Sequence, residues 1–135
     1  MRGRALALGA ALVAAALAHP ASAADSGQFA RYSYTNAKGT LTYKLYTPPK
    51  RGAHPSSLVV VLPGAGETSD DAAMRSRFNE VAQRLRFDVA YPEQNPAYNS
   101  SLEWDWATAS KEGRSNREAS VIADITRYVT DVQDL

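Results

Sequence analysis

Five consecutive apolar residues, Leu58–Leu62, run directly into the turn Pro63–Gly66, and this junction most constrains the fold. A short apolar run bounded by turn residues is typical of a strand buried on both faces, as in a parallel sheet. The polar residues Ser69–Asp71 follow, and they suit the first turn of a helix. The order of strand, glycine turn and helix therefore indicates an α/β fold.

The other patterns predict the elements around this junction. Alternating side chains predict an antiparallel hairpin from strands over 29–35 and 40–47. Apolar residues at helical spacing predict helices over 70–86 and 117–132. A short strand is expected over 87–91, ended by the proline that follows it. Strand, helix and strand in this order imply a right-handed crossover and a mostly parallel sheet.

Residues 1–23 have the three parts of a secretory signal peptide, and we expect them to be removed. Two arginines form the basic start, residues 5–18 the apolar centre, and residues 21–23 the small-residue cleavage pattern. The apolar centre is shorter than the ~20 residues that span a membrane, which argues against a retained anchor. We therefore expect a secreted protein whose residues 24–135 belong to one domain, with no membrane contact after cleavage.

The predicted mature chain is close to neutral. Removing the two signal arginines from the 15 basic residues leaves 13, against 14 acidic ones, so the net charge is −1. This balance gives no reason to expect nucleic acid or an anionic membrane as a partner. The chain has no cysteine, so it forms no disulfide even in an oxidising compartment.

Four short motifs occur in an order and at a spacing that resemble a known family. They are Leu62-Pro-Gly-Ala-Gly66, Asn79-Glu-Val-Ala82, Tyr91-Pro-Glu-Gln94 and Trp104-Asp-Trp106. The set resembles the N-terminal part of secreted α/β-hydrolase esterases of the poly(3-hydroxybutyrate) depolymerase and feruloyl/acetylxylan esterase type. The resemblance implies a partial α/β-hydrolase sheet: an antiparallel hairpin, then parallel strands with helices, truncated before the nucleophile strand.

The resemblance also implies a function, that of a secreted carboxylic ester hydrolase of the serine type. Its substrate would be a polyester or an acylated polysaccharide, and it would need no cofactor or metal. Such enzymes use a serine, a histidine, a carboxylate and two N–H donors for the oxyanion. By the family match, Gly64, Ala65 and Gly66 would form the oxyanion loop, with the Ala65 N–H as the donor. Three positions depart from the family pattern: Pro63 replaces a histidine, Ala65 replaces a cysteine, and Glu103 stands where a cysteine often precedes the first tryptophan.

The catalytic triad is absent from the sequence. The chain contains no Gly-x-Ser-x-Gly motif, and after the signal its one histidine is His54, in a polar loop. In the resemblance, the serine, aspartate and histidine all lie beyond Leu135. We therefore expect the chain to be an N-terminal fragment that is inactive alone, with no catalytic residue of its own.

Several residues leave alternatives open. Gly64–Gly66 could be a plain turn, and as a phosphate cradle the segment lacks the further glycine or lysine of the nucleotide motifs. Trp104 and Trp106, in the long polar loop 92–116, could bind substrate or cap the sheet as core. An alternative function is that of a small secreted non-catalytic module that binds carbohydrate or polyester through these two tryptophans. The acidic residues of that loop, Glu103, Asp105 and Glu112, are more typical of a solvated surface than of paired catalytic carboxylates.

Overall fold

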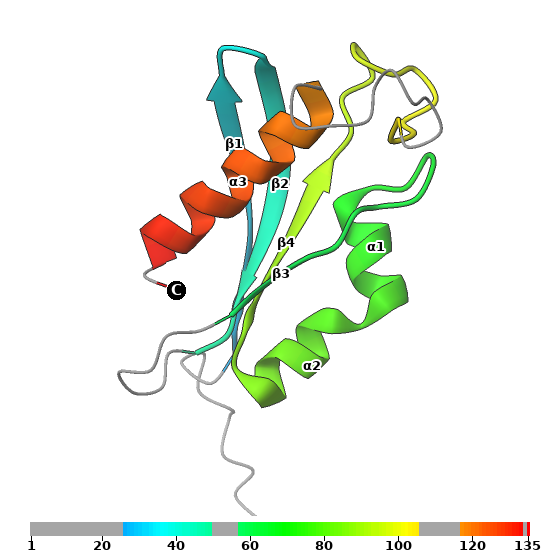
Figure 1. Cartoon of the computed structure of the whole chain (residues 1–135). Helices are drawn as coiled ribbons and strands as arrows, with labels where there is room; N and C mark the ends of the chain where they lie inside the picture. The colour runs from blue at the N-terminus through cyan, green and yellow to red at the C-terminus, as the bar shows by residue number, and fades with distance from the viewer. Residues whose placement is uncertain (1–25, 50–56, 106–116, 134) are drawn as a thin grey trace, which may run out of the picture.

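The computed structural model describes residues 26–49, 57–105, 117–133 and 135. The predicted signal peptide, His54 and Trp106 lie outside these residues. The described residues form a four-stranded sheet with helices on both of its faces (Figure 1). This arrangement is compatible with a partial α/β fold.

The predicted hairpin is confirmed. Strand β1 (Gln28–Asn36) pairs antiparallel with β2 (Gly39–Thr47) along its whole length. The turn is closed by the Asn36 side chain, whose Oδ1 accepts the N–H groups of Lys38 at 2.8 Å and Gly39 at 3.2 Å. Asparagine is favoured in such turns because its short side chain bonds the backbone just after it.

The sheet order is β1-β2-β4-β3, with β3 at Leu58–Val60 and β4 at Asp88–Glu93. Strand β4 is antiparallel to β2 and parallel to β3. The crossover therefore gives a parallel pair, as the strand–helix–strand order predicts. The expectation of a mostly parallel sheet is wrong for the described strands, because β4 lies between β3 and the hairpin and so pairs antiparallel with β2.

Pro92 does not end β4, contrary to expectation, and its Cα lies opposite Tyr43 of β2. Backbone groups of alternate strand residues point to the same side. The Ala90 carbonyl faces the β3 side, because it accepts the Val61 N–H at 2.9 Å. Pro92 lies two residues later in the strand, so its backbone nitrogen also faces the β3 side. The β3 pairing ends at Ala90, and a missing N–H is therefore tolerated there.

The helix predicted over 70–86 is two helices, α1 (Ser69–Ser76) and α2 (Phe78–Leu85). Arg77 separates them in the left-handed conformation, with φ 54° and ψ 23°. The break resets the helical phase, so the predicted apolar stripe does not form one face. Met74 and Leu85, two of the apolar residues at helical spacing within 70–86, are 74% and 70% exposed.

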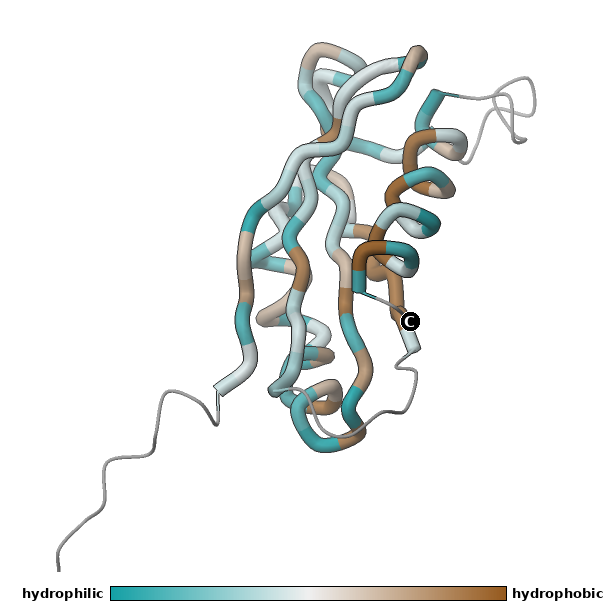
Figure 2. The backbone as a smooth tube through the Cα atoms, turned by 90° about the vertical axis from the view of Figure 1, so that its left-hand side faces the viewer, coloured by the Kyte–Doolittle hydropathy of each residue, from teal (hydrophilic) through white to brown (hydrophobic). Residues whose placement is uncertain are grey.

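Two apolar layers hold the helices to the sheet. Helix α3 (Arg117–Gln133) confirms the predicted C-terminal helix within one residue, and its apolar residues recur on successive turns (Figure 2). The layer under α3 is built from these buried residues: Leu41, Tyr43, Leu45, Ala90, Trp104, Val121, Ile125 and Val129. The layer under α1 and α2 is built from Tyr46, Ala72, Ala73, Ala82, Val89 and Tyr91. Within the described part of the chain, no helix has the length and apolar character needed to cross a bilayer.

Replacing Arg77 tests the cause of the helix break. Left-handed backbone costs a residue with a Cβ about 1–2 kcal/mol, whereas glycine adopts it freely. The free energy of unfolding of Arg77→Gly should therefore be about 1 kcal/mol higher than that of Arg77→Ala, as measured by urea denaturation followed by circular dichroism. Both variants lose the exposed Arg77–Glu80 ion pair, so their difference isolates the backbone. Equal stabilities would contradict a strained Arg77.

Tyr43 and Tyr91 should make the fold sensitive to alkali. Burial raises the pKa of both phenols to about 12, and for Tyr43 the nearby Tyr128 and Tyr32 add to the effect. In the unfolded chain each ionises near its ordinary value of 10.0, so stability is complete below that pH and falls as the pH rises toward 12. The slope should approach about 1.4 kcal/mol per pH unit for each tyrosine. In urea titrations from pH 9 to 11, Tyr43→Phe should reduce the slope, and an unchanged slope would contradict this assignment.

Candidate functional site

The loop that joins β3 to α1 lies at the carboxyl end of the parallel pair. Figure 1 shows this loop beside the segment that follows β4, both at the same edge of the sheet. Ligands of α/β proteins bind at this edge, because the loops after parallel strands meet there. The predicted oxyanion residues Gly64, Ala65 and Gly66 are all in this loop, and all three are exposed.

The loop between β3 and α1, the glycine loop, contains a closed turn from Gly64 to Glu67. The Glu67 N–H donates to the Gly64 carbonyl at 3.0 Å, and the Glu67 carboxylate accepts the Gly64 N–H at 2.7 Å. Gly66 has φ 71°, a left-handed value that glycine adopts without strain. Within the described residues, the N–H groups of Ala65 and Gly66 donate to no partner. They are the donors that the turn leaves available to a ligand.

Glu67 is also held from the helix that follows the loop. Arg75 of α1 donates two hydrogen bonds to it, each 2.8 Å long, one to each carboxylate oxygen. The Arg75 guanidinium and the Gly64 N–H lower the pKa of Glu67 below its ordinary value. The carboxylate is therefore ionised at neutral pH and remains paired.

The start of α1 is fixed beside the loop by a capping box. Thr68 accepts the Asp71 N–H at 3.2 Å through its hydroxyl, and the Asp71 carboxylate accepts the Thr68 N–H at 3.0 Å. The N-cap is thus Thr68, directly before the polar residues Ser69–Asp71 of the first turn. The Ser69 hydroxyl is fully buried and donates to the Tyr91 carbonyl at 2.8 Å, so this serine is a structural bridge between α1 and β4.

Trp104 holds the other end of the loop. It is 6% exposed and packs in the α3 layer, and its Nε1–H donates to the Pro63 carbonyl at 2.9 Å. This geometry favours the core alternative over a surface for stacking substrate. Trp106, the second predicted substrate-binding residue, lies outside the described residues.

A buried carboxylate ties the segment after β4 to α3. Glu118 is 8% exposed, and its two oxygens accept the Gln94 side-chain amide at 2.7 Å and the Asp105 N–H at 2.9 Å. Gln94 also donates to the carbonyl of Glu103, whose side chain is exposed. Glu103 and Asp105 join this network through a backbone carbonyl and a backbone N–H, respectively.

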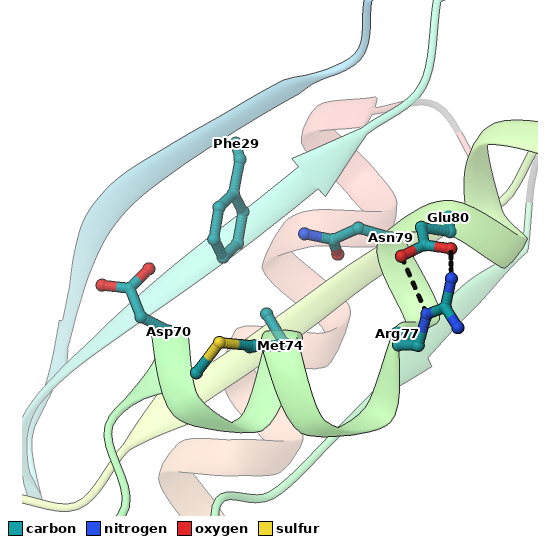
Figure 3. Close-up of a pocket in the computed structure, with 7 residues that line it drawn as sticks. Phe29, Asp70, Met74, Arg77, Asn79 and Glu80 are labelled. Carbon is teal, nitrogen blue, oxygen red and sulfur yellow. Dashed lines mark hydrogen bonds and ion pairs between the residues drawn. The ribbon is translucent and has the colours of Figure 1, made fainter.

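Apart from the glycine loop, a hollow lies on the α1–α2 side of the sheet (Figure 3). It has a volume of about 510 Å³ and is lined by Phe29, Asp70, Ala73, Met74, Arg77, Asn79 and Glu80. None of the glycine-loop residues lines it. Arg77 and Glu80, which are three positions apart, form an ion pair at its rim. No serine, threonine or cysteine lines it, and the described residues contain no cluster of three potential metal ligands.

Sequence reasoning missed the residues that hold the loop in place. Glu67 and Arg75 are eight positions apart, and no periodicity links a loop residue to a helix residue. Gln94 belongs to one of the four motifs, but its contact with Glu118 requires the tertiary fold. The signal available in the sequence was an ionisable residue, Glu67, placed directly after a glycine turn where a polar cap is common.

One comparison with known proteins gives a match. A protein-family model described as "Esterase PHB depolymerase" matches residues 41–133, which run from β2 to the end of α3. Comparison with the curated proteins gives no match. The matched span contains the glycine loop and every hydrogen bond described above for this site.

Trp104→Phe tests whether the indole holds the loop. The variant keeps an aromatic ring in the core but leaves the buried Pro63 carbonyl without its donor, which costs about 1–3 kcal/mol. The loss should appear in the urea midpoint. Tyr128→Phe is the control, because Tyr128 is 46% exposed and should change stability by less than about 0.5 kcal/mol. A Trp104→Phe variant as stable as this control would contradict the role of the indole.

Proposed function

The chain belongs to the PHB-depolymerase esterase family, and on that basis we propose that it is the N-terminal part of a secreted serine ester hydrolase. Membership of the family implies an ester as substrate. A polyester or an acylated polysaccharide fits the secreted location that residues 1–23 suggest. The nucleophile, the histidine and the carboxylate are then supplied by sequence that follows Leu135.

The glycine loop is the observation that carries this proposal. It stands at the carboxyl edge of the sheet and presents the N–H groups of Ala65 and Gly66 without a partner among the described residues. Ester hydrolysis creates a negative oxygen in the transition state, and backbone N–H groups fixed in advance stabilise it. In α/β-hydrolases one such donor comes from the loop after the third strand and the other from the nucleophile turn.

In this mechanism the Ala65 N–H donates to the developing oxyanion. Losing one donor of this kind costs about 2.7–4 kcal/mol of transition-state stabilisation, or about 10²–10³ in rate. Pro63 supplies no N–H itself, but its carbonyl is fixed by Trp104, which sets where the loop begins. Trp104 thus contributes to the site by positioning the backbone.

The alternative of a non-catalytic binding module has less support. It needs Trp104 and Trp106 as an exposed platform, and Trp104 is buried with its indole N–H bonded inside the fold. Stacking on a sugar ring or an acyl group requires a free aromatic face. The proposal of an ester hydrolase does not depend on either tryptophan contacting substrate.

Hydrolysis of a p-nitrophenyl ester tests the proposed function. The chain ending at Leu135 should give no turnover, whereas the full reading frame that contains it should be active. The activity should disappear with a serine-directed phosphonate and with substitution of the serine in a Gly-x-Ser-x-Gly motif beyond Leu135.

Two results would contradict the proposal. One is serine-dependent turnover by the chain that ends at Leu135. The other is a full reading frame that contains no Gly-x-Ser-x-Gly sequence after this residue and hydrolyses no ester.

A further inference from the structure

The carboxylate of Glu67 occupies a position inside the loop that is proposed to bind a negative oxygen. Its Oε2 accepts both the Gly64 N–H at 2.7 Å and an Arg75 N–H at 2.8 Å. A Cβ added at Gly64 would lie 3.1 Å from the same oxygen, so the carboxylate is seated directly against the glycine. The Glu67 carboxylate therefore closes the turn by accepting the N–H of Gly64, the first residue of the turn.

This contact decides which N–H groups the loop can offer. The Gly64 N–H is taken by Glu67, and Pro63 has none. The donors that remain are those of Ala65 and Gly66, at the apex of a turn fixed at both ends. Fixing the apex in advance matters because oxyanion donors act only when they are already aimed at the developing charge.

The same contact brings a like charge close to the reaction. An ionised carboxylate beside an oxyanion raises the energy of the transition state, unless a cation cancels it. Arg75 is that cation, and its two hydrogen bonds to Glu67 leave neither carboxylate oxygen unpaired. Asp71 is the other acidic group close enough to affect Glu67, and it bonds the backbone and hydroxyl of Thr68 instead of Arg75.

We infer that Glu67 is a positioning residue for the oxyanion loop, and that Arg75 neutralises the charge which Glu67 places there. The inference rests on the proposed ester hydrolysis and assigns separate roles to these two residues. Glu67 sets the geometry of the Ala65 donor, and Arg75 makes a carboxylate at this position compatible with an oxyanion. Neither side chain touches the reacting atoms.

The test uses variants of the full reading frame that contains this chain, assayed for kcat and KM on a p-nitrophenyl ester. Glu67→Ala frees the Gly64 N–H and loosens the apex, so kcat should fall by about tenfold or more with KM little changed. Arg75→Ala leaves the carboxylate unneutralised, and kcat should fall by a similar factor. Adding Glu67→Gln to Arg75→Ala removes the charge but keeps an oxygen acceptor, so it should recover most of the lost kcat.

A spectroscopic readout follows the contact itself. In protein labelled with ¹⁵N-glycine, the Gly64 amide proton should shift in Glu67→Ala. It should also titrate in the wild type as Glu67 takes up its proton, below the ordinary pKa of a glutamate because Arg75 and the Gly64 N–H lower it. Glu80→Gln is the matched control, since Glu80 forms a comparable exposed pair with Arg77 far from the loop. It should change neither the Gly64 signal nor kcat.

Two results would overturn the inference. One is a Glu67→Ala variant that behaves like Glu80→Gln in both measurements, and the other is an Arg75→Ala loss that Glu67→Gln does not reverse. Failure of the proposed function looks different, because the wild-type reading frame would then be inactive on esters. In that case an unmoved Gly64 signal in Glu67→Ala would also exclude Glu67 from holding the loop.

Discussion

Strand β4 is the constraint on which the rest of the structure depends. It is hydrogen-bonded on both edges, antiparallel to β2 and parallel to β3, and nearly all of it is buried. Its carboxyl end supplies the acceptors and donors that fix the surrounding loops. The Tyr91 carbonyl receives Ser69 from the start of α1, and the Gln94 amide reaches Glu118 at the start of α3. Both helices are thereby positioned from one strand.

Hydrogen bonds join the four motifs on which the resemblance to the family rests. Tyr91 donates to Asn79 of α2 at 2.7 Å, and Trp104 donates to Pro63 at the glycine loop. Residues far apart in the chain therefore form one framework around the carboxyl edge of the sheet. Each of these two hydrogen bonds joins residues of two different motifs. The glycine loop is the part of the framework that faces outward.

Local patterns predicted the elements whose boundaries local chemistry decides. The alternation of β2, the asparagine turn before it and the apolar face of α3 each reflect contacts within a few residues. The break at Arg77 could not be predicted in this way, because no glycine or proline marks it. The continuation of β4 through Pro92 depends on where the neighbouring strand β3 ends, which is a tertiary property.

In the candidate site, too, some features follow from local patterns and others depend on the tertiary fold. The place of Gly64–Gly66 at the carboxyl edge followed from the order of strand, turn and helix. The hydrogen bond that buries Trp104 and the Arg75 contact that pairs Glu67 depend on the way α1 and the segment after β4 approach the loop. A loop residue and a helix residue carry no common periodicity, so side-chain contacts of this kind become visible only in the fold.

We propose that the loop after β3 holds the oxyanion of an ester hydrolase. The sharpest test is a crystal structure of the full reading frame with a phosphonate covalently bound to its nucleophile, since the phosphonyl oxygen occupies the place of the oxyanion. This oxygen should lie about 2.7–3.1 Å from the backbone nitrogen of Ala65, with the Glu67 contact to Gly64 intact. A phosphonyl oxygen bound by other groups, with Ala65 out of hydrogen-bonding reach, would show that this loop does not hold the oxyanion.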